Sequence, residues 1–264
     1  MDILRQALAP ISDTAWEELN QQARRVLRSL LSARSFVEVQ GPHGWSYGAI
    51  PTGRLAISEQ LVVEGVRYGH RVSQPLVEAR AGFTLSRWEL DNISRGLETP
   101  DLSTMEEAAM AIAAFEERAV YRGLAEGEIP GLQASSEYKA QAFGESAEEA
   151  LAAVTRGVAL FHERGVGGPY SLVVGPERWR TLAVHVSGYP LTRHLERRIG
   201  GSIILSPCVE QCVLVSERGG DFRLTLGQDV SIGYEGHRND EVDLYFTESF
   251  AFQVFDPAAV LLFQ

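Results

Sequence analysis

The sequence contains little lysine and little cysteine. Of its 24 basic residues only Lys139 is a lysine, and the other 23 are arginines. Arginine favours bidentate pairing at interfaces, although a biased genome composition explains the count equally well. The two cysteines, Cys208 and Cys212, are too few for a disulfide framework. Apart from Glu210, no histidine or acid lies near them at metal-site spacing, so we interpret them as small interior residues and expect no metal site.

Long apolar runs are also missing. No stretch approaches the roughly 18 consecutive apolar residues of a membrane-spanning helix. The first ten residues, MDILRQALAP, carry an acid at position 2 and do not have the pattern of a signal peptide. The formal net charge of −11 argues against nucleic-acid binding, which needs a basic face. We therefore expect a cytoplasmic protein with neither a membrane nor a nucleic acid as partner.

Motifs for catalysis are absent as well. The sequence has neither the G-x-S-x-G elbow of serine hydrolases nor the H-E-x-x-H helix of zinc proteases. His162, His185 and His194 lie in separate stretches. The carboxylate pairs Glu106–Glu107 and Glu116–Glu117 are typical of solvated helix surfaces. The sequence therefore predicts no catalytic residues and no enzyme.

The residues that are present indicate an α+β protein. With 45% hydrophobic and 22% charged residues, the composition is that of an ordinary globular chain. Helical and strand patterns are mixed without regular βαβ alternation. Four helices are predicted: one capped by Thr14 and Glu17, one from Ser103 to Gly123, one capped by Ser146 and Glu149, and a short one with Pro176 in its first turn. Strands are predicted over 36–39, 77–85, 170–174, 203–205 and 242–254.

The stretch 213–235 suggests a β-hairpin. Apolar residues alternate with polar ones over 213–215 and again over 222–226, and Gly219 and Gly220 between them accept positive φ. A second break at 227–229 precedes further alternation. Glu248 interrupts the apolar face of the last predicted strand, where a carboxylate needs a partner or a bulge.

Several motifs in order along the chain resemble the encapsulin shell proteins, the linocin-like bacteriocin family. They are LAPIS near the start, GPHGW, PLVEARAGFTLSRWELDNISRG, RGGDF, GQD, SIGYE and TESFAFQV. The resemblance covers essentially all 264 residues. Members of this family are bacterial and archaeal nanocompartment subunits with the capsid fold of tailed bacteriophages, of the Hong Kong phage type.

The resemblance implies a division of the chain into four parts. Residues 1–47 are the N-terminal arm, a helix and the first strand of the peripheral domain. Residues 48–74, which carry weak local signals, are the extended loop that lies on a neighbouring subunit. Residues 75–127 and 222–264 form the peripheral domain with its long spine helix, and residues 128–221 form the axial domain.

The resemblance implies a structural function. Copies of the chain, 60 in the smallest shell, assemble into an icosahedral cage around a cargo enzyme. The implied cargo is a ferritin-like protein or a dye-decolorising peroxidase, in iron storage or oxidative-stress defence. The alternatives are a secreted bacteriocin or protease, an activity given in older descriptions of the family, and a phage major capsid protein.

Cargo enters such shells through a C-terminal peptide that docks on the inner surface, beside the N-terminal helix. An apolar groove flanked by one cation and one acid suits such a peptide. The alternative is that Leu27, Leu31 and Phe36 belong to the core. The positions that match the site are Leu27, Leu31, Arg34, Phe36, Glu38, Asp229, Ile232 and Tyr234.

Two further sites are implied by the resemblance. A loop of His185, Val186, Ser187, Gly188 and Tyr189 matches the axial tip that rings the five-fold pore. Some members bind flavin, such as FMN, on the outer face against a tryptophan. Trp88 matches that position with Arg80 as a partner, although a packed or interface aromatic is the alternative. No cofactor is required.

Overall fold

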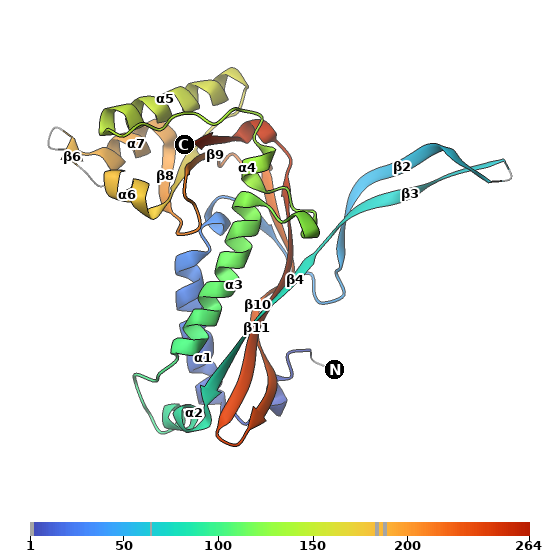
Figure 1. The fold of residues 1–264 in the computed structure, drawn as a ribbon, viewed down its shortest axis with the longest axis vertical. Coiled ribbons are helices and arrows are strands. Elements are labelled where there is room, and N and C mark those ends of the chain that lie inside the picture. The colour runs from blue at the N-terminus through green and yellow to red at the C-terminus, as the bar shows by residue number, and fades with distance from the viewer. Residues whose placement is uncertain (1–2, 64, 183–184, 187–188) are drawn as a thin grey trace.

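The computed structural model describes residues 3–63, 65–182, 185–186 and 189–264. It contains two sheets flanked by helices and a long hairpin that projects from the body (Figure 1). The helices are α1 (Asp13–Leu30), α2 (Arg87–Ser94), α3 (Ser103–Arg122), α4 (Gly131–Ser135), α5 (Ala147–Glu163), α6 (Pro176–Leu182) and α7 (Leu191–Ile199). The strands are β1 (Glu38–Gln40), β2 (Ala49–Val63), β3 (Val66–Pro75), β4 (Val77–Ser86), β5 (Tyr170–Val174), β6 (His185–Val186), β7 (Tyr189–Pro190), β8 (Gly200–Leu205), β9 (Cys212–Ser216), β10 (Phe222–Arg238), β11 (Glu241–Val254) and β12 (Val260–Phe263). This mixture confirms the predicted α+β class.

The first sheet has the strand order β1-β10-β11-β4 and packs against α1 and α3. β1 runs parallel to β10, and the other pairs are antiparallel. Apolar side chains from the helices, such as Leu19 and Ile112, share one core with Phe83 and Phe246 of the sheet. The predicted alternation over 77–85 is confirmed, since β4 turns Phe83 and Leu85 toward this core.

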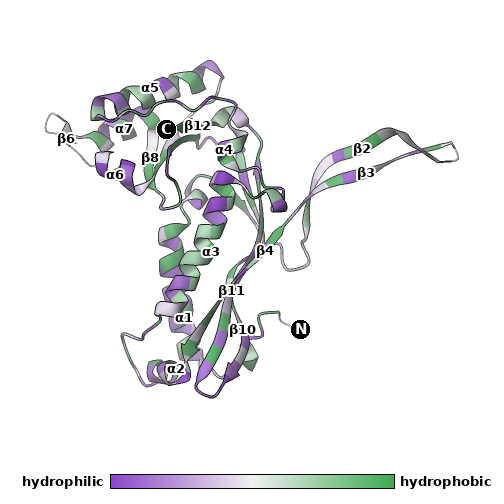
Figure 2. Ribbon diagram, in the orientation of Figure 1, coloured by the Kyte–Doolittle hydropathy of each residue, from purple (hydrophilic) through white to green (hydrophobic). Residues whose placement is uncertain are grey.

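The second sheet has the order β12-β9-β5-β8. Its core joins strand residues such as Leu172 and Leu214 to Phe161 of α5. Figure 2 shows hydrophilic and hydrophobic residues alternating along α5, as expected for a helix that covers a sheet on one face. The C-terminal strand β12 pairs with β9 and therefore extends the second sheet. The predicted boundaries place residues 222–264, which include β12, in the domain of the first sheet.

The predicted hairpin across residues 219–220 is wrong. β9 pairs with β5 and β12, whereas β10 pairs with β1 and β11 in the other sheet. The chain therefore crosses between sheets at this turn. The predicted break at 227–229 is a pair of register shifts inside the continuous strand β10, that is, a bulge.

Helix ends are partly as predicted. The first helix is capped by Ser12, whose Oγ accepts a hydrogen bond from the Ala15 N–H, so the predicted box of Thr14 and Glu17 is wrong. The capping box of Ser146 and Glu149 is confirmed. Gly123 ends α3 with φ 92°, and a Cβ there would lie 2.6 Å from the Pro130 oxygen, which explains the glycine.

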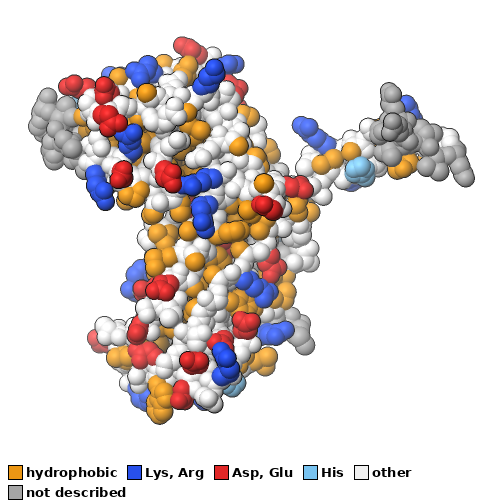
Figure 3. All heavy atoms as spheres, in the orientation of Figure 1, with side chains coloured by type: hydrophobic (Ala, Val, Ile, Leu, Met, Phe, Trp, Pro, Cys, Tyr) orange, Lys and Arg blue, Asp and Glu red, His pale blue; other side chains and the backbone are white. Residues whose placement is uncertain are grey.

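β2 and β3 form the projecting hairpin. Ala49 pairs with Pro75 at its base and Val63 with Val66 near its tip. Several large apolar residues on it are exposed, among them Ile57 (68%) and Val66 (63%). Figure 3 shows the hairpin standing away from the body with hydrophobic side chains at its surface. Such a ribbon buries little within its own chain and is marginally stable alone.

Candidate functional site: a groove between α1 and β10

A groove of about 650 Å³ lies between α1 and the bulged part of β10. We call it the α1–β10 groove. Its apolar lining comes from the helix end and from Val230, and charged side chains flank it. The lining residues are Arg24, Leu27, Arg28, Leu31, Arg34, Asp229, Val230 and Ser231.

The periodicity of α1 explains this lining. Leu19, Ala23 and Leu27 recur every four residues and are buried against α3 and the first sheet. Arg24 and Arg28 occupy the next row, so they are exposed and border the groove. The helix ends at Leu30, and the chain then turns through a 3-10 segment, Ala33–Ser35, which brings Arg34 opposite Asp229.

Arg34 is held in one position by several carboxylates. Its Nη1 lies 2.8 Å from Oδ1 of Asp229 on the groove wall. Its Nε donates to both oxygens of Glu116 at 2.9 and 3.1 Å, and Nη2 also contacts Glu116. Nη2 lies 3.7 Å from Oε2 of Glu248. Burial alone would lower the pKa of Arg34, but Glu116 and Asp229 outweigh it and raise the pKa, so the guanidinium stays charged.

Glu248 is the carboxylate that the sequence left without a partner. It is fully buried, and neither of its oxygens accepts a hydrogen bond from a described donor. Burial and the neighbouring charge of Glu116 raise its pKa well above the ordinary range. These effects favour the protonated form of Glu248, which can donate a hydrogen bond to Glu116.

Glu116 and Glu117 are both fully buried, so their prediction as a solvated helix surface is wrong. The two residues point in different directions from α3. Glu116 faces Arg34, whereas Glu117 accepts hydrogen bonds from the Ala33 N–H at 2.9 Å and from Ser206 Oγ at 3.1 Å. It also accepts one from Ser32 Oγ. Burial raises the pKa of Glu117 to about 7 despite these bonds.

Four of the eight predicted cargo-site residues line the groove together: Leu27, Leu31, Arg34 and Asp229. The other four do not. Phe36 is buried between Tyr121 and Phe222, with ring centroids 6.2 Å from each. Ile232 and Tyr234 are buried in the core of the first sheet, and Glu38 is exposed in an ion pair with Arg223 at 3.2 Å.

Sequence reasoning missed Arg24, Arg28, Val230 and Ser231 as lining residues. The two arginines were detectable, because they flank Leu27 at positions that share one side of a helix. Val230 and Ser231 were not, because the bulge at 227–229 turns them into the groove and a bulge cannot be read from alternation alone.

The predicted pore loop is only partly visible. His185–Val186 forms β6 and pairs antiparallel with Tyr189–Pro190 of β7. Ser187 and Gly188 lie outside the described residues, as do the side chains of His185, Val186 and Tyr189.

Trp88 and Arg80 are not brought together within one chain. Trp88 is 61% exposed at the start of α2. Arg80 lies on β4, eight residues before Trp88. The strand from Arg80 to its end at Ser86 rises by roughly 20 Å, which separates the two residues. The Arg80 guanidinium covers the Tyr245 ring at 4.7 Å and pairs with Glu78. An exposed indole fits ring stacking, but Arg80 does not fit as its partner in the same subunit.

No group of three or more His, Cys, Asp or Glu is placed to hold a metal ion in the part of the chain that the structure describes. No described helix is both long and apolar enough to cross a membrane.

Solved structures identify the fold. The structure is similar to a virus-like particle protein from Pyrococcus furiosus, with a TM-score of 0.69 and 18% identity, covering 94% of this chain and 98% of that chain. It is also similar to the capsid protein of Myoviridae phage XM1, with a TM-score of 0.56 and 12% identity over 89% and 91% of the two chains. The predicted capsid fold is confirmed.

Sequence comparison then gives the family. The family model described as "Encapsulating protein for peroxidase" matches residues 1–251. A type 1 encapsulin shell protein of Rhodospirillum rubrum is 39% identical over 99% of this chain and 96% of its own length. One from Mycolicibacterium paratuberculosis is 36% identical over 99% and 98%. The chain belongs to the encapsulin shell protein family, and its role is that of a homo-oligomeric shell subunit.

Proposed function

We propose that the shell built from this chain encloses an enzyme whose C-terminal peptide docks in the α1–β10 groove. The observation that carries the proposal is the fixed guanidinium of Arg34 beside an apolar floor of Leu27 and Leu31. A side chain already held in place loses little entropy when it binds a ligand, which favours affinity. A short extended peptide with small apolar residues and a charge fits such a groove.

The remaining features of the proposal follow from the shell role. The assembly is the smallest icosahedral one, of 60 copies, in the cytoplasm, and the β2–β3 hairpin lies on a neighbouring subunit. The cargo is a ferritin-like protein or a dye-decolorising peroxidase in iron storage or oxidative-stress defence. The shell itself is not an enzyme, and the 185–189 loop rings a pore. A flavin on the outer face stacks on the exposed indole of Trp88.

The test uses a fluorescent protein fused in turn to the C-terminal tail of each ferritin-like protein and peroxidase encoded in the same genome. Each fusion is co-expressed with the shell protein, and the purified shells are treated with protease. We expect one tail to give fluorescence that co-purifies with shells and resists digestion. Fluorescence that is fully digested for every tail would contradict the proposal.

A groove-filling variant makes the test specific. Val230→Trp places an indole in the groove, and Met110→Trp, at an exposed position on α3 outside the groove, is the matched control. Both variants are first checked for intact shells. We expect loading to fall at least tenfold for Val230→Trp only.

A further inference from the structure

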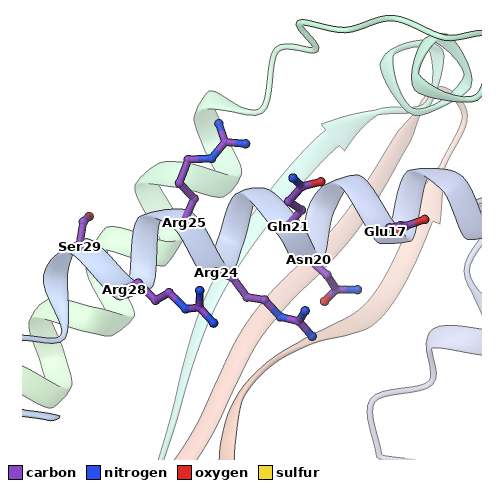
Figure 4. A pocket seen from close by; sticks show the side chains of 7 residues that line it. All are labelled: Glu17, Asn20, Gln21, Arg24, Arg25, Arg28 and Ser29. Atoms are coloured by element: carbon purple, nitrogen blue, oxygen red, sulfur yellow. The ribbon is translucent and has the colours of Figure 1, made fainter. Parts of the chain in front are cut away.

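The α1–β10 groove continues along the helix as a second concavity of about 870 Å³. The two share Arg24 and Arg28. Figure 4 shows Asn20, Arg24 and Arg28 leaving α1 on one side, while Arg25 leaves it on the other. We call Arg24 and Arg28 the α1 arginine track.

The track carries positive charge that the chain does not neutralise. Among the described residues, neither of its two arginines forms an ion pair, whereas Arg34, Arg122 and Arg218 all do. The acids nearest along the two concavities are Glu17, at the far end, and Asp229, which is engaged by Arg34. A cationic strip is therefore present on a chain whose net charge is −11.

The fold gains little from this charge, apart from the favourable position of Arg28 in the last turn of α1, near the negative end of the helix dipole. Arg24 and Arg28 are one helical turn apart, and like charges at that spacing destabilise a helix. Their side chains are exposed, so they cover no core. A repulsive arrangement beside a groove is explained if a ligand supplies the missing negative charge.

The backbone next to the groove suits an extended ligand. The outer edge of β10 is covered by β1 over 223–225, and Leu226 and Gly227 accept hydrogen bonds from the N–H groups of His43 and Gly44. Further on, the N-terminal arm covers the edge, where Gln6 donates to the Ile232 oxygen and Tyr234 donates to the Leu4 oxygen. Between them, no described strand covers residues 228–231, three of which line the groove.

We propose that the α1 arginine track binds the carboxylates of an acidic, extended peptide segment that continues from the peptide in the α1–β10 groove. This inference rests on the proposed function and names the chemistry of the cargo peptide. The Cα atoms of Arg24 and Arg28 are about 6 Å apart along the helix axis. Alternate residues of an extended peptide are about 6.6 Å apart. Acids at alternate positions therefore match the two guanidinium groups, each of which can pair with a carboxylate through two hydrogen bonds.

A peptide is favoured over a nucleic acid because the concavity continues into an apolar floor. Leu27, Leu31 and Val230 offer no partner to phosphate or sugar. A cargo tail that combines apolar residues with acids satisfies both parts of the surface at once.

The experiment uses the tail that directs loading in the test above, fused to a fluorescent protein. Two alternate positions directly before its apolar part are made Asp, Asn or Lys, and fluorescence per shell is measured at 50 and 500 mM NaCl. We expect the Asp form to load at least fivefold more than the Lys form at low salt. The difference should shrink at high salt, because exposed charges are screened.

Two double variants complete the design. Arg24→Gln/Arg28→Gln should bring the ratio of Asp to Lys loading close to 1. Arg156→Gln/Arg197→Gln, which removes two exposed arginines from α5 and α7, should leave the ratio unchanged.

The outcomes separate the two proposals. Equal loading of the three tails overturns the arginine track and leaves groove docking intact. Loading that is undiminished in Val230→Trp shells overturns groove docking itself. Co-purifying nucleic acid that disappears in Arg24→Gln/Arg28→Gln shells would show that the track binds phosphates, which overturns the peptide assignment.

Discussion

Arg34, which lines the α1–β10 groove, forms an ion pair with Glu116, a buried residue of the spine helix α3. Arg34 Nε lies 2.9 Å from Glu116 Oε1, and the carboxylate is fully buried. The side chain that is proposed to meet the cargo peptide therefore also neutralises a buried acid. A charge in this position cannot be changed without consequences for the fold.

Replacing Arg34 by Met should destabilise the protein by about 3–5 kcal/mol, because it leaves buried Glu116 unpaired. Arg34→Glu should yield no shells. The double variant Arg34→Met/Glu116→Gln removes both charges and should recover most of the loss. Thermal unfolding and shell yield measure these effects.

Asp229→Ala is the control for these variants. Because Asp229 is 48% exposed, its ion pair with Arg34 contributes at most about 1 kcal/mol to stability. Shells of Arg34→Met with an unchanged midpoint would contradict this account.

Glu117 should make stability depend on pH. Its pKa is raised from 4.5 to about 7 in the folded protein. The folded state therefore keeps a proton that the unfolded state has lost, so stability falls as pH rises from 4.5 to 7, by about 3 kcal/mol. Glu117→Gln should flatten the dependence of the unfolding midpoint between pH 5 and 8. Glu107→Gln, at an exposed position on the same helix, should not change it. Equal slopes for both variants would show that Glu117 is ionised throughout.

The sequence allowed the fold to be predicted but not these buried acids. Motifs spread over the chain identify the family, and α3 has the expected length. Glu116 and Glu117 look like a solvated pair because a local pattern contains no information about what covers a helix. Here α1, the first sheet and the loop at Ser206 enclose α3 on several sides. The false hairpin has the same origin, since the partners of β9 are distant in the chain.

Glu248→Gln should leave the protein folded and should stabilise it at alkaline pH. The glutamine amide can still donate a hydrogen bond to Glu116, and unlike the carboxyl group it does not ionise as pH rises. Because the folded pKa of Glu248 is raised, its favourable contribution is complete at acidic pH and is lost as pH rises. Unfolding midpoints of wild type and variant should agree near pH 5 and diverge at pH 8. A variant that is less stable at pH 8 would show that Glu248 acts as a carboxylate.

Deleting residues 53–70 should block assembly without unfolding the body. The described side chains of the hairpin lie outside both hydrophobic cores, and apolar ones such as Ile57 are exposed. Size-exclusion chromatography should show small species, while circular dichroism should retain the helix signal. Normal shells from the deletion would show that the hairpin makes no essential contact between subunits.

Shell formation tests the central claim most directly. Purified protein can be examined by native mass measurement together with electron microscopy of the same sample. Sixty copies of a 29.0 kDa chain predict uniform hollow particles of about 1.7 MDa. A monomer or a small oligomer as the only species would contradict the account.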